Sequence, residues 1–345
     1  MSIIPVEVPT GAIRYNTDSN KMECFNGTKW YEISVTTPDL DGGARAVFPG
    51  GHAPPAATNS NVIDFVTISS AGNAIDFGDL DGSDGRAQCA GFSSRTRGCI
   101  AGGENPGIKD TIDYFTMSSK GNSLDFGTLL ANNRAISGNG FANATRGFVA
   151  GGYTAPSYTD TIQYVTIAST GNAVDFGNMT WTGATCCGAL TSPTRGLIGG
   201  GSAPSGSEPN TIQLLTLTTL GNAEDFGDLS VGRDGVASAS NATRGIWAGG
   251  SVWPALYNVI DYVEIATLGN AMDFGDTIIT NRARFGAASP TRVVWAGGYG
   301  APNGSTSKDD IDYNTIATRG NSVDFGNLTQ ARGWSQASST GHGGL

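Results

Sequence analysis

Hydrophobic positions along this chain alternate with small or polar ones in short runs, and the same runs return about every fifty residues. The copies share a Gly/Ala/Ser-rich run, an apolar run that ends in Gly-Gly, an Ile-(Asp/Gln) run with an aromatic residue next in five of six copies, and a run that holds Asp-Phe-Gly. No long stretch places apolar residues at helical spacing. The pattern therefore predicts an all-β fold, built from units of four strands, with almost no helix.

The Asp-Phe-Gly triplet gives the period and the number of these units. It occurs six times at intervals of 48–51 residues, at Asp76, Asp125, Asp175, Asp225, Asp273 and Asp324. A period of this length, made from strand and turn signals alone, is typical of propellers and related arrays. The first copy begins at a second strand (residues 45–51), whereas the last copy ends after a first strand (residues 331–339). We expect the C-terminal strand to complete the first unit and to close a six-bladed β-propeller without exposed edges.

Local signals place the strands within each unit. The first strands are expected at residues 86–93, 134–141, 184–191, 233–240, 282–289 and 332–339. Their small side chains indicate a position near a crowded central axis. A Gly-Asn dipeptide separates the third and fourth strands in all six copies, and glycine in this place predicts a two-residue type II′ hairpin.

The second and third strands resemble the kelch repeat. Four apolar or small residues precede a glycine pair in residues 147–152 (Gly-Phe-Val-Ala-Gly-Gly), and a spaced Ile-Asp-Tyr follows in other copies, as at residues 311–313. The resemblance covers residues 41–345 and implies a kelch-like propeller of four-stranded blades. Kelch units usually carry tryptophan in the fourth strand, where this chain has the phenylalanine of Asp-Phe-Gly.

Residues 1–40 do not repeat, and they predict three short strands with turns at residues 17–20 and 26–28, followed by a linker at residues 36–43. The opening Gly-x-Ile-Arg-aromatic-Asn-Thr-Asp at residues 11–18 and the close Asn-Gly-Thr-x-Trp at residues 26–30 resemble a small β module of tailed-bacteriophage tail-fibre and other virion proteins. The resemblance implies that residues 1–40 attach to other virion proteins, in a particle assembled in the host cytoplasm, and it is compatible with a homo-oligomer such as a trimer.

Charge and composition exclude several partners. The formal net charge is −10 and no basic stripe or tail occurs, so the sequence argues against a nucleic-acid partner. No apolar run approaches the roughly 18 residues of a membrane-spanning helix, and the start of the chain lacks the features of a signal peptide. The five cysteines show no zinc-ligand spacing and are interpreted as packing residues.

Several motifs suggest chemistry, but the repeat explains most of them. Six copies of Asp-Phe-Gly without a phosphate loop favour a structural role over a kinase metal site. Six arginines open the second strands and are expected to pair with carboxylates or with backbone carbonyls between blades, the alternative being anion binding. They are Arg45, Arg97, Arg146, Arg195, Arg244 and Arg292.

Metal and catalytic sites find little support. Residues 79–85 (Asp-Leu-Asp-Gly-Ser-Asp-Gly) resemble part of a calcium loop, but Ala90 stands where the twelfth-position glutamate belongs. His52 and His342 are the only histidines, too few for a copper oxidase of the galactose oxidase kind, which shares the kelch architecture. The sequence thus indicates no cofactor, no metal site, no catalytic residue and no enzyme activity.

The loops differ between the two faces of the expected propeller. Connections between second and third strands, together with those between fourth and first strands, lie on one face, here called the variable face, because they differ in every copy. The second-to-third connections include residues 52–55, 104–107, 153–158, 202–205, 251–257 and 299–303. Variable loops on a rigid scaffold favour recognition. The candidate ligand-binding residues are His52, Tyr153, Tyr158, Trp181, Trp253, Tyr257 and Tyr299. The alternative is that these aromatic side chains pack onto blade edges.

Three functions remain open on the sequence alone. The first is a tail-fibre or tail-tip protein whose variable face binds a host-surface glycan or protein. The second is a purely structural decoration or adaptor protein of the capsid or tail. The third, with less support, is a carbohydrate-active enzyme.

Overall fold

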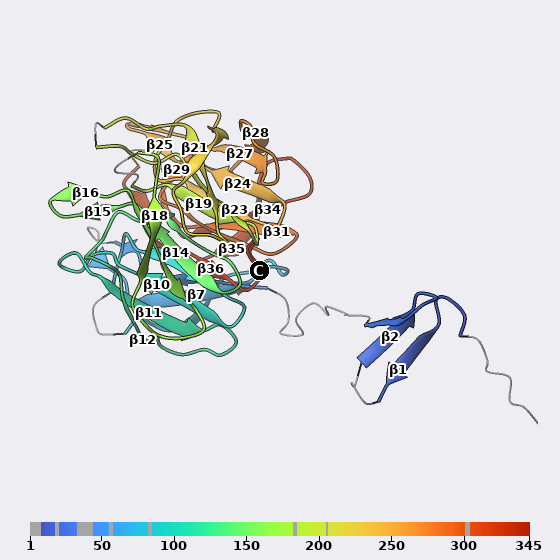
Figure 1. The fold of residues 1–345 in the computed structure, drawn as a ribbon. Helices are drawn as coiled ribbons and strands as arrows, with labels where there is room; N and C mark the ends of the chain where they lie inside the picture. The colour runs from blue at the N-terminus through green and yellow to red at the C-terminus, as the bar shows by residue number, and fades with distance from the viewer. Residues whose placement is uncertain are drawn as a thin grey trace, which may run out of the picture. The chain divides into compact units, whose positions relative to one another are not determined.

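The computed structural model describes residues 8–17, 21–32, 44–54, 58–81, 85–181, 185–204, 206–300 and 304–345. The chain divides into two compact units, Met1–Gly42 and Gly43–Leu345 (Figure 1). Every regular element in the described residues is a β-strand, as the sequence predicts. The expected linker at residues 36–43 lies outside the described residues, as do most of the expected turn at residues 17–20 and the centre of the calcium-like loop at residues 79–85.

The smaller unit contains the three strands that the sequence predicts. They are β1 (Ile13–Asn16), β2 (Lys21–Phe25) and β3 (Trp30–Glu32), joined in one antiparallel sheet in that order. The turn before β3 is held by Asn26, whose side-chain oxygen accepts hydrogen bonds from the backbone N–H groups of Thr28 (3.0 Å) and Lys29 (2.9 Å). On the sheet, the Arg14 guanidinium lies 4.1 Å from the centre of the Trp30 ring.

The larger unit contains six four-stranded antiparallel sheets within the described residues, an arrangement consistent with a β-propeller (Figure 1). Sheet 1 combines the two ends of the unit: β36 (Ser338–Ser339), β4 (Arg45–Pro49), β7 (Val62–Thr67) and β8 (Ile75–Asp79). Sheet 2 holds β9 (Ala90–Ser93), β10 (Arg97–Ala101), β11 (Thr111–Thr116) and β12 (Leu124–Thr128). Sheet 3 holds β13 (Gly140–Ala142), β14 (Arg146–Ala150), β17 (Thr161–Thr166) and β18 (Val174–Asn178).

The other three sheets follow the same order. Sheet 4 holds β19 (Gly188–Thr191), β20 (Arg195–Gly199), β21 (Thr211–Thr216) and β22 (Glu224–Asp228). Sheet 5 holds β23 (Ala237–Ser240), β24 (Arg244–Ala248), β27 (Val259–Glu264) and β28 (Met272–Asp276). Sheet 6 holds β30 (Phe285–Ala288), β31 (Arg292–Ala296), β34 (Asp310–Thr315) and β35 (Val323–Asn327).

Short strands also form within the loops of the variable face. They are β5 (His52–Ala53) with β6 (Thr58–Asn59), β15 (Tyr153–Thr154) with β16 (Ser157–Tyr158), β25 (Ser251–Val252) with β26 (Ala255–Leu256), and β29 (Asn281–Arg282) with β32 (Tyr299–Gly300) and β33 (Thr306–Ser307). Residues 55–57, 205 and 301–303 of these loops are not described.

The first strands start later than the sequence predicts. In sheet 2 the strand begins at Ala90 instead of residue 86, because Gln88 has a left-handed backbone (φ 56°) that turns the chain. Ala135, Cys186, Ala283 and Trp334 adopt the same conformation at equivalent positions (φ 54–58°). Gly235 (φ 60°) takes this conformation in the remaining copy, so all six fourth-to-first connections contain the same bend.

The Gly-Asn dipeptide does not form the expected two-residue hairpin. In sheet 2 the third strand ends at Thr116 and the fourth begins at Leu124, so a longer connection carries the dipeptide. Asn122 instead reaches the neighbouring sheet, where its side-chain oxygen accepts the Asp79 N–H (3.1 Å). Equivalent bonds, from the last residue of each fourth strand to the next sheet, occur at Asn172, Asn222, Asn270, Asn321 and Asn73. The Gly-Asn motif therefore links each sheet to its neighbour through a hydrogen bond, and this link is called here the Gly-Asn clasp.

Five of the six arginines at the start of the second strands also join neighbouring sheets, which confirms for these five the prediction that they meet backbone carbonyls; the sixth, Arg146, instead lies over the Tyr164 ring (4.8 Å). Arg45 donates to the Met117 carbonyl (2.9 Å), and Arg97 donates to the Ile167 carbonyl (3.0 Å). Arg195, Arg244 and Arg292 make the equivalent bonds. The guanidinium of Arg97 also lies 4.5 Å from the centre of the Tyr114 ring, so its charge contributes to packing.

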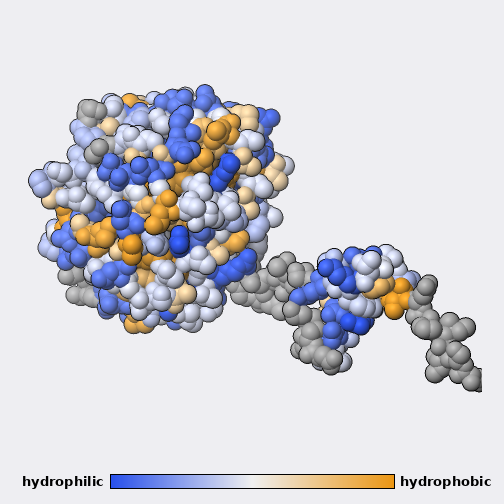
Figure 2. Space-filling view, in the orientation of Figure 1, coloured by the Kyte–Doolittle hydropathy of each residue, from blue (hydrophilic) through white to orange (hydrophobic). Residues whose placement is uncertain are grey.

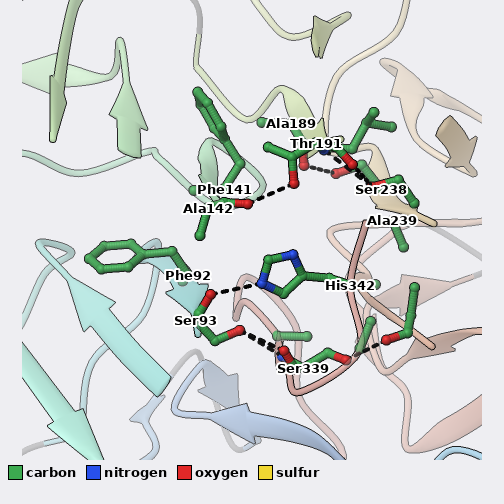
Figure 3. A pocket seen from close by; sticks show the side chains of 18 of the residues that line it. Phe92, Ser93, Phe141, Ala142, Ala189, Thr191, Ser238, Ala239, Ser339 and His342 are labelled. Atoms are coloured by element: carbon green, nitrogen blue, oxygen red, sulfur yellow. Dashed lines mark hydrogen bonds between the residues drawn. The ribbon is translucent and has the colours of Figure 1, made fainter. Parts of the chain in front are cut away.

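The first strands of the six sheets surround a small cavity of about 50 Å³, lined mostly by glycine, alanine and serine. The C-terminal residues close one end of it, and Figure 3 shows the His342 ring among these strands. His342 Nε2 lies 2.7 Å from the Ser93 carbonyl oxygen, and Nδ1 accepts the Gly344 N–H (3.2 Å). These two bonds define a neutral imidazole, and burial lowers its pKa to about 4.

Candidate functional site

Six pairs of residues give the variable face a constant backbone with changing side chains. In each unit, the first residue after the glycine pair forms an antiparallel β-bridge with one residue of the connection between a fourth strand and the next first strand. The bridged pairs are His52 with Gly333, Glu104 with Ala87, Tyr153 with Arg134, Ser202 with Thr185, Ser251 with Asp234, and Tyr299 with Arg282. Because the bridge is the same in all six units, these pairs differ between units only in their side chains.

An open cavity on this face lies where the loops of sheets 6 and 1 meet. Its volume is about 530 Å³, within the range of about 300–1,000 Å³ typical of small-ligand sites. It is open to solvent and is lined by His52, Pro54, Arg282, Tyr299, Gly304, Ser305, Thr306, Ser307 and Trp334. The lining combines two aromatic rings, one guanidinium and three hydroxyl groups.

Tyr299 forms a fixed wall of the cavity. Its ring covers Gly333, where a Cβ atom would lie only 2.5 Å from Tyr299 Cε2, so glycine is required for this close approach. The residue is only 8% exposed, and burial raises the pKa of its phenol despite a hydrogen bond with Ser307. The ring is therefore neutral and positioned before any ligand arrives.

Arg282 stands between two tryptophans at the edge of the cavity. Its guanidinium carbon lies 4.8 Å from the ring centre of Trp253 and 5.6 Å from that of Trp334. The Arg282 Nε atom is buried and has no hydrogen-bond partner among the described residues. The two cation–π contacts hold the guanidinium in place, and its side chain makes no hydrogen bond with the described residues.

His52 also lines the cavity. Its Nε2 lies 3.7 Å from Oε1 of Glu104, which would favour the charged ring, but burial has the larger effect and lowers the pKa of His52. Glu104 is already engaged, since Gln88 and Arg134 both donate hydrogen bonds to its carboxylate. His52 is therefore neutral at neutral pH and can donate or accept one hydrogen bond.

The predicted ligand-binding residues separate into three groups. His52 and Tyr299 line the cavity. Trp253 is 57% exposed and does not line it, but its ring contacts Arg282, which does. Tyr153 and Tyr158 pack together elsewhere on the face, with ring centres 5.2 Å apart.

The third group does not reach the cavity. Tyr257 is half-buried and lies near Arg233, beyond the lining residues. Trp181 packs against the hydrophobic cluster around Phe141, Phe148 and Leu215, which agrees with the alternative that such rings cover sheet edges. Two of the seven predicted residues thus line one site and a third adjoins it.

Sequence reasoning missed Arg282 and Trp334 because it assigned both to first strands. A signal was present for Trp334. Aligned by their left-handed backbone, the equivalent residues are Gln88, Ala135, Cys186, Gly235 and Ala283, and four of these five are small. A single large aromatic residue in a series of small ones points to a local role that the repeat does not require.

A second, more polar cavity of about 240 Å³ lies between the loops of sheets 1 and 2. Its lining includes Asp81, Asp113 and Asp125, but Arg86 forms an ion pair with Asp113, and Lys109 also lines the space. No group of three histidine, cysteine, aspartate or glutamate residues in the described chain could hold a metal ion.

Neither protein-family models nor curated proteins gave a match to this chain. The described residues include no helix long and apolar enough to cross a membrane. On the surface of the larger unit, apolar side chains reach solvent among polar ones (Figure 2). Because these comparisons gave no match, the site is interpreted from its own geometry and chemistry.

Proposed function

We propose that the six sheets are the blades of one closed, kelch-like β-propeller. The first strands lie next to one another in the order β36, β9, β13, β19, β23 and β30, and β30 in turn contacts β36. The Gly-Asn clasp also joins sheet 6 to sheet 1, through Asn73 and Asn327 (3.1 Å). Both observations support a ring without free edges.

On this scaffold we propose a virion protein of a tailed phage, in a tail fibre or tail tip, that binds a host-surface glycan. The observation that carries the binding function is the open cavity of about 530 Å³ with Trp334, Tyr299, Arg282 and hydroxyl groups in its lining. Aromatic rings present flat apolar faces to sugar rings, and hydroxyl and imidazole groups pair with sugar hydroxyls. Residues 1–40 would attach the protein to other virion components.

The test is binding of the purified chain to an array of bacterial surface glycans. We expect binding to at least one glycan, and a loss of about tenfold or more in Tyr299→Ala and Trp253→Ala, because aromatic anchors carry much of the energy of an interface. Tyr158→Ala is the matched control, since Tyr158 is an exposed aromatic on the same face outside the cavity. Unchanged binding in both cavity variants would refute this site.

A structural role as a decoration or adaptor protein is the second candidate, and one observation favours it. The residue before Asp-Phe-Gly is apolar and 48–57% exposed in five of the six sheets, at Ile75, Leu124, Val174, Met272 and Val323. Such a row on the outermost strands could pack against other virion proteins. Electron microscopy of the intact virion separates the two roles: buried outer strands favour decoration, and a free variable face at a tail tip favours host binding.

A further inference from the structure

We infer that the cavity between sheets 6 and 1 binds a sugar that carries a single carboxylate, and that Arg282 is the residue that holds this carboxylate. The inference rests on the proposed glycan-binding function and names the class of glycan.

The strongest evidence is the difference between Arg282 and Arg134, which occupy equivalent positions. Each is bridged to a tyrosine in the loop of its own sheet and lies over an aromatic ring. Arg134 is neutralised, because its guanidinium forms an ion pair with Glu104 of the preceding sheet. The residue equivalent to Glu104 beside Arg282 is Ser251, which has no charge.

Arg282 thus lacks the partner that its counterpart has. In the described part of the chain its side chain makes no hydrogen bond and has no carboxylate within 4.0 Å, whereas the Nε atoms of both Arg282 and Arg134 are buried without a partner. Asp234 is close enough to interact electrostatically with Arg282, but its carboxylate accepts a hydrogen bond from Ser251 instead (2.5 Å). A guanidinium that remains without a partner beside a cavity is suited to an anion from outside the chain.

The two tryptophans explain why the positive charge remains available. The Arg282 guanidinium lies over the rings of Trp253 and Trp334, and these contacts use none of its N–H donors in a hydrogen bond. Gly304 brings the loop of sheet 6 close to this stack, since a Cβ atom there would lie 3.2 Å from Trp253 and 3.6 Å from Arg282 Nε. Three loops therefore fix the orientation of the donors before binding.

The charge of the cavity selects the type of anion. Arg282 is the only Asp, Glu, Lys or Arg residue among the described residues of the lining, and His52 is neutral at neutral pH. One positive charge matches the single negative charge of a carboxylate, whereas a phosphate monoester carries about −1.5 to −2. The net charge of −10 also opposes non-specific binding of polyanions, so binding of an acidic glycan would depend on this site.

The rest of the lining suits a sugar ring. Trp334 and Tyr299 supply aromatic surfaces to the lining, and Ser305, Thr306 and Ser307 supply hydroxyl groups. These groups pair with sugar hydroxyls without adding charge. A small carboxylate such as acetate would use only the arginine, so the site favours a carboxylated sugar over a simple acid.

The experiment uses the full chain on an array that pairs each acidic oligosaccharide with its carboxyl-reduced, neutral form. Hexuronic acids and nonulosonic acids form separate arms, which distinguishes these two sources of the carboxylate. We expect at least one acidic member to bind about ten- to hundredfold more tightly than its neutral form, the range for a hydrogen bond to a charged group. This comparison needs no variant.

Variants then assign the effect to Arg282. Arg282→Gln should abolish the preference for the acidic form, Arg282→Lys should retain part of it, and the control Arg134→Gln should keep it in full, with thermal unfolding measured for each. Binding of neutral and reduced glycans alone, or a preference that survives Arg282→Gln, overturns the inference and leaves the proposed glycan-binding function intact. Binding to no glycan on the array overturns both.

Discussion

Arg332 and Asp64 form a fully buried ion pair, with Arg332 Nη1 2.9 Å from Asp64 Oδ2 and no exposure of either side chain. Arg332 also donates to the Phe48 carbonyl (2.9 Å), and Asp64 accepts hydrogen bonds from the backbone and hydroxyl of Thr329. The pair joins a residue near the end of the chain to the first sheet. Sheets 2, 5 and 6 contain related pairs, at Asp113, Asp261 and Asp312.

Asp64→Asn should destabilise the protein strongly, because it leaves the Arg332 charge buried without its partner. The expected loss is about 3–5 kcal/mol in the free energy of unfolding, measured by urea denaturation. Asp324→Asn is the control: this aspartate lies on an outer strand and is exposed, so its change should stay within about 0.5 kcal/mol.

Sheet 3 suggests a second substitution pair that restores the stability lost in Asp64→Asn. Gln163 and Asn133 occupy the positions of Asp64 and Arg332 there, and the Gln163 side chain accepts the Leu130 N–H (2.8 Å). The double variant Asp64→Gln with Arg332→Asn should therefore recover most of the lost stability. A double variant that is less stable than Asp64→Asn would show that the charge is needed for another reason.

The glycine of Asp-Phe-Gly should tolerate no side chain. Gly227 has φ +150°, a backbone largely confined to glycine, and a Cβ atom there would lie 2.4 Å from the Gly269 carbonyl oxygen in the next sheet. Gly269 has φ +149° but no atom within 4 Å of a Cβ. Gly269→Ala should cost about 1–3 kcal/mol from backbone strain alone, and Gly227→Ala should cost more. Thermal unfolding of the two variants separates the cost of backbone strain from the cost of the steric clash with the next sheet. Equal losses of stability in the two variants would contradict the close contact between sheets at Gly227.

The main features of the fold could be predicted because each copy confirms the others. The period, the strand order and the structural role of Asp-Phe-Gly follow from agreement among six copies. The Gly-Asn clasp was misinterpreted because the partner of Asn122 is Asp79 of another sheet. A dipeptide that bonds to a distant strand resembles a local turn when only its own neighbours are considered.

The site was predicted less well for a different reason. His52 and Tyr299 were found because aromatic and imidazole groups in variable loops are conspicuous in a sequence. Arg282 becomes informative only in space, where its guanidinium lies over two tryptophans from different loops and no carboxylate of the described residues comes within 4.0 Å. The sequence shows that an arginine is present, and the structure is needed to show that the charge is unpaired.

The buried His342 predicts a pH effect on stability. Its pKa in the folded protein is about 4, below the ordinary 6.5, so the unfolded chain takes up the proton first as the pH falls. Stability should be unaffected above pH 6.5, fall between pH 6.5 and 4, and then level off. The total loss is at most about 3 kcal/mol. The difference in unfolding free energy between the native protein and His342→Gln should shrink as the pH falls from 6.5 to 4. A difference that stays constant over this range would exclude the effect.

Gly333→Ala should reduce binding without removing any group that contacts the ligand. A Cβ atom at this position would lie 2.5 Å from Tyr299 Cε2, so the ring must shift, and the cavity that it lines is altered. We expect at least about a tenfold loss of glycan affinity with a stability cost of about 1–3 kcal/mol, as for other overpacked sites. Gly107→Ala is the matched control, because a Cβ atom in that loop of sheet 2 meets no atom within 4 Å. Native affinity in Gly333→Ala, measured on the glycan that binds the unmodified chain, would mean that the position of Tyr299 does not control the site.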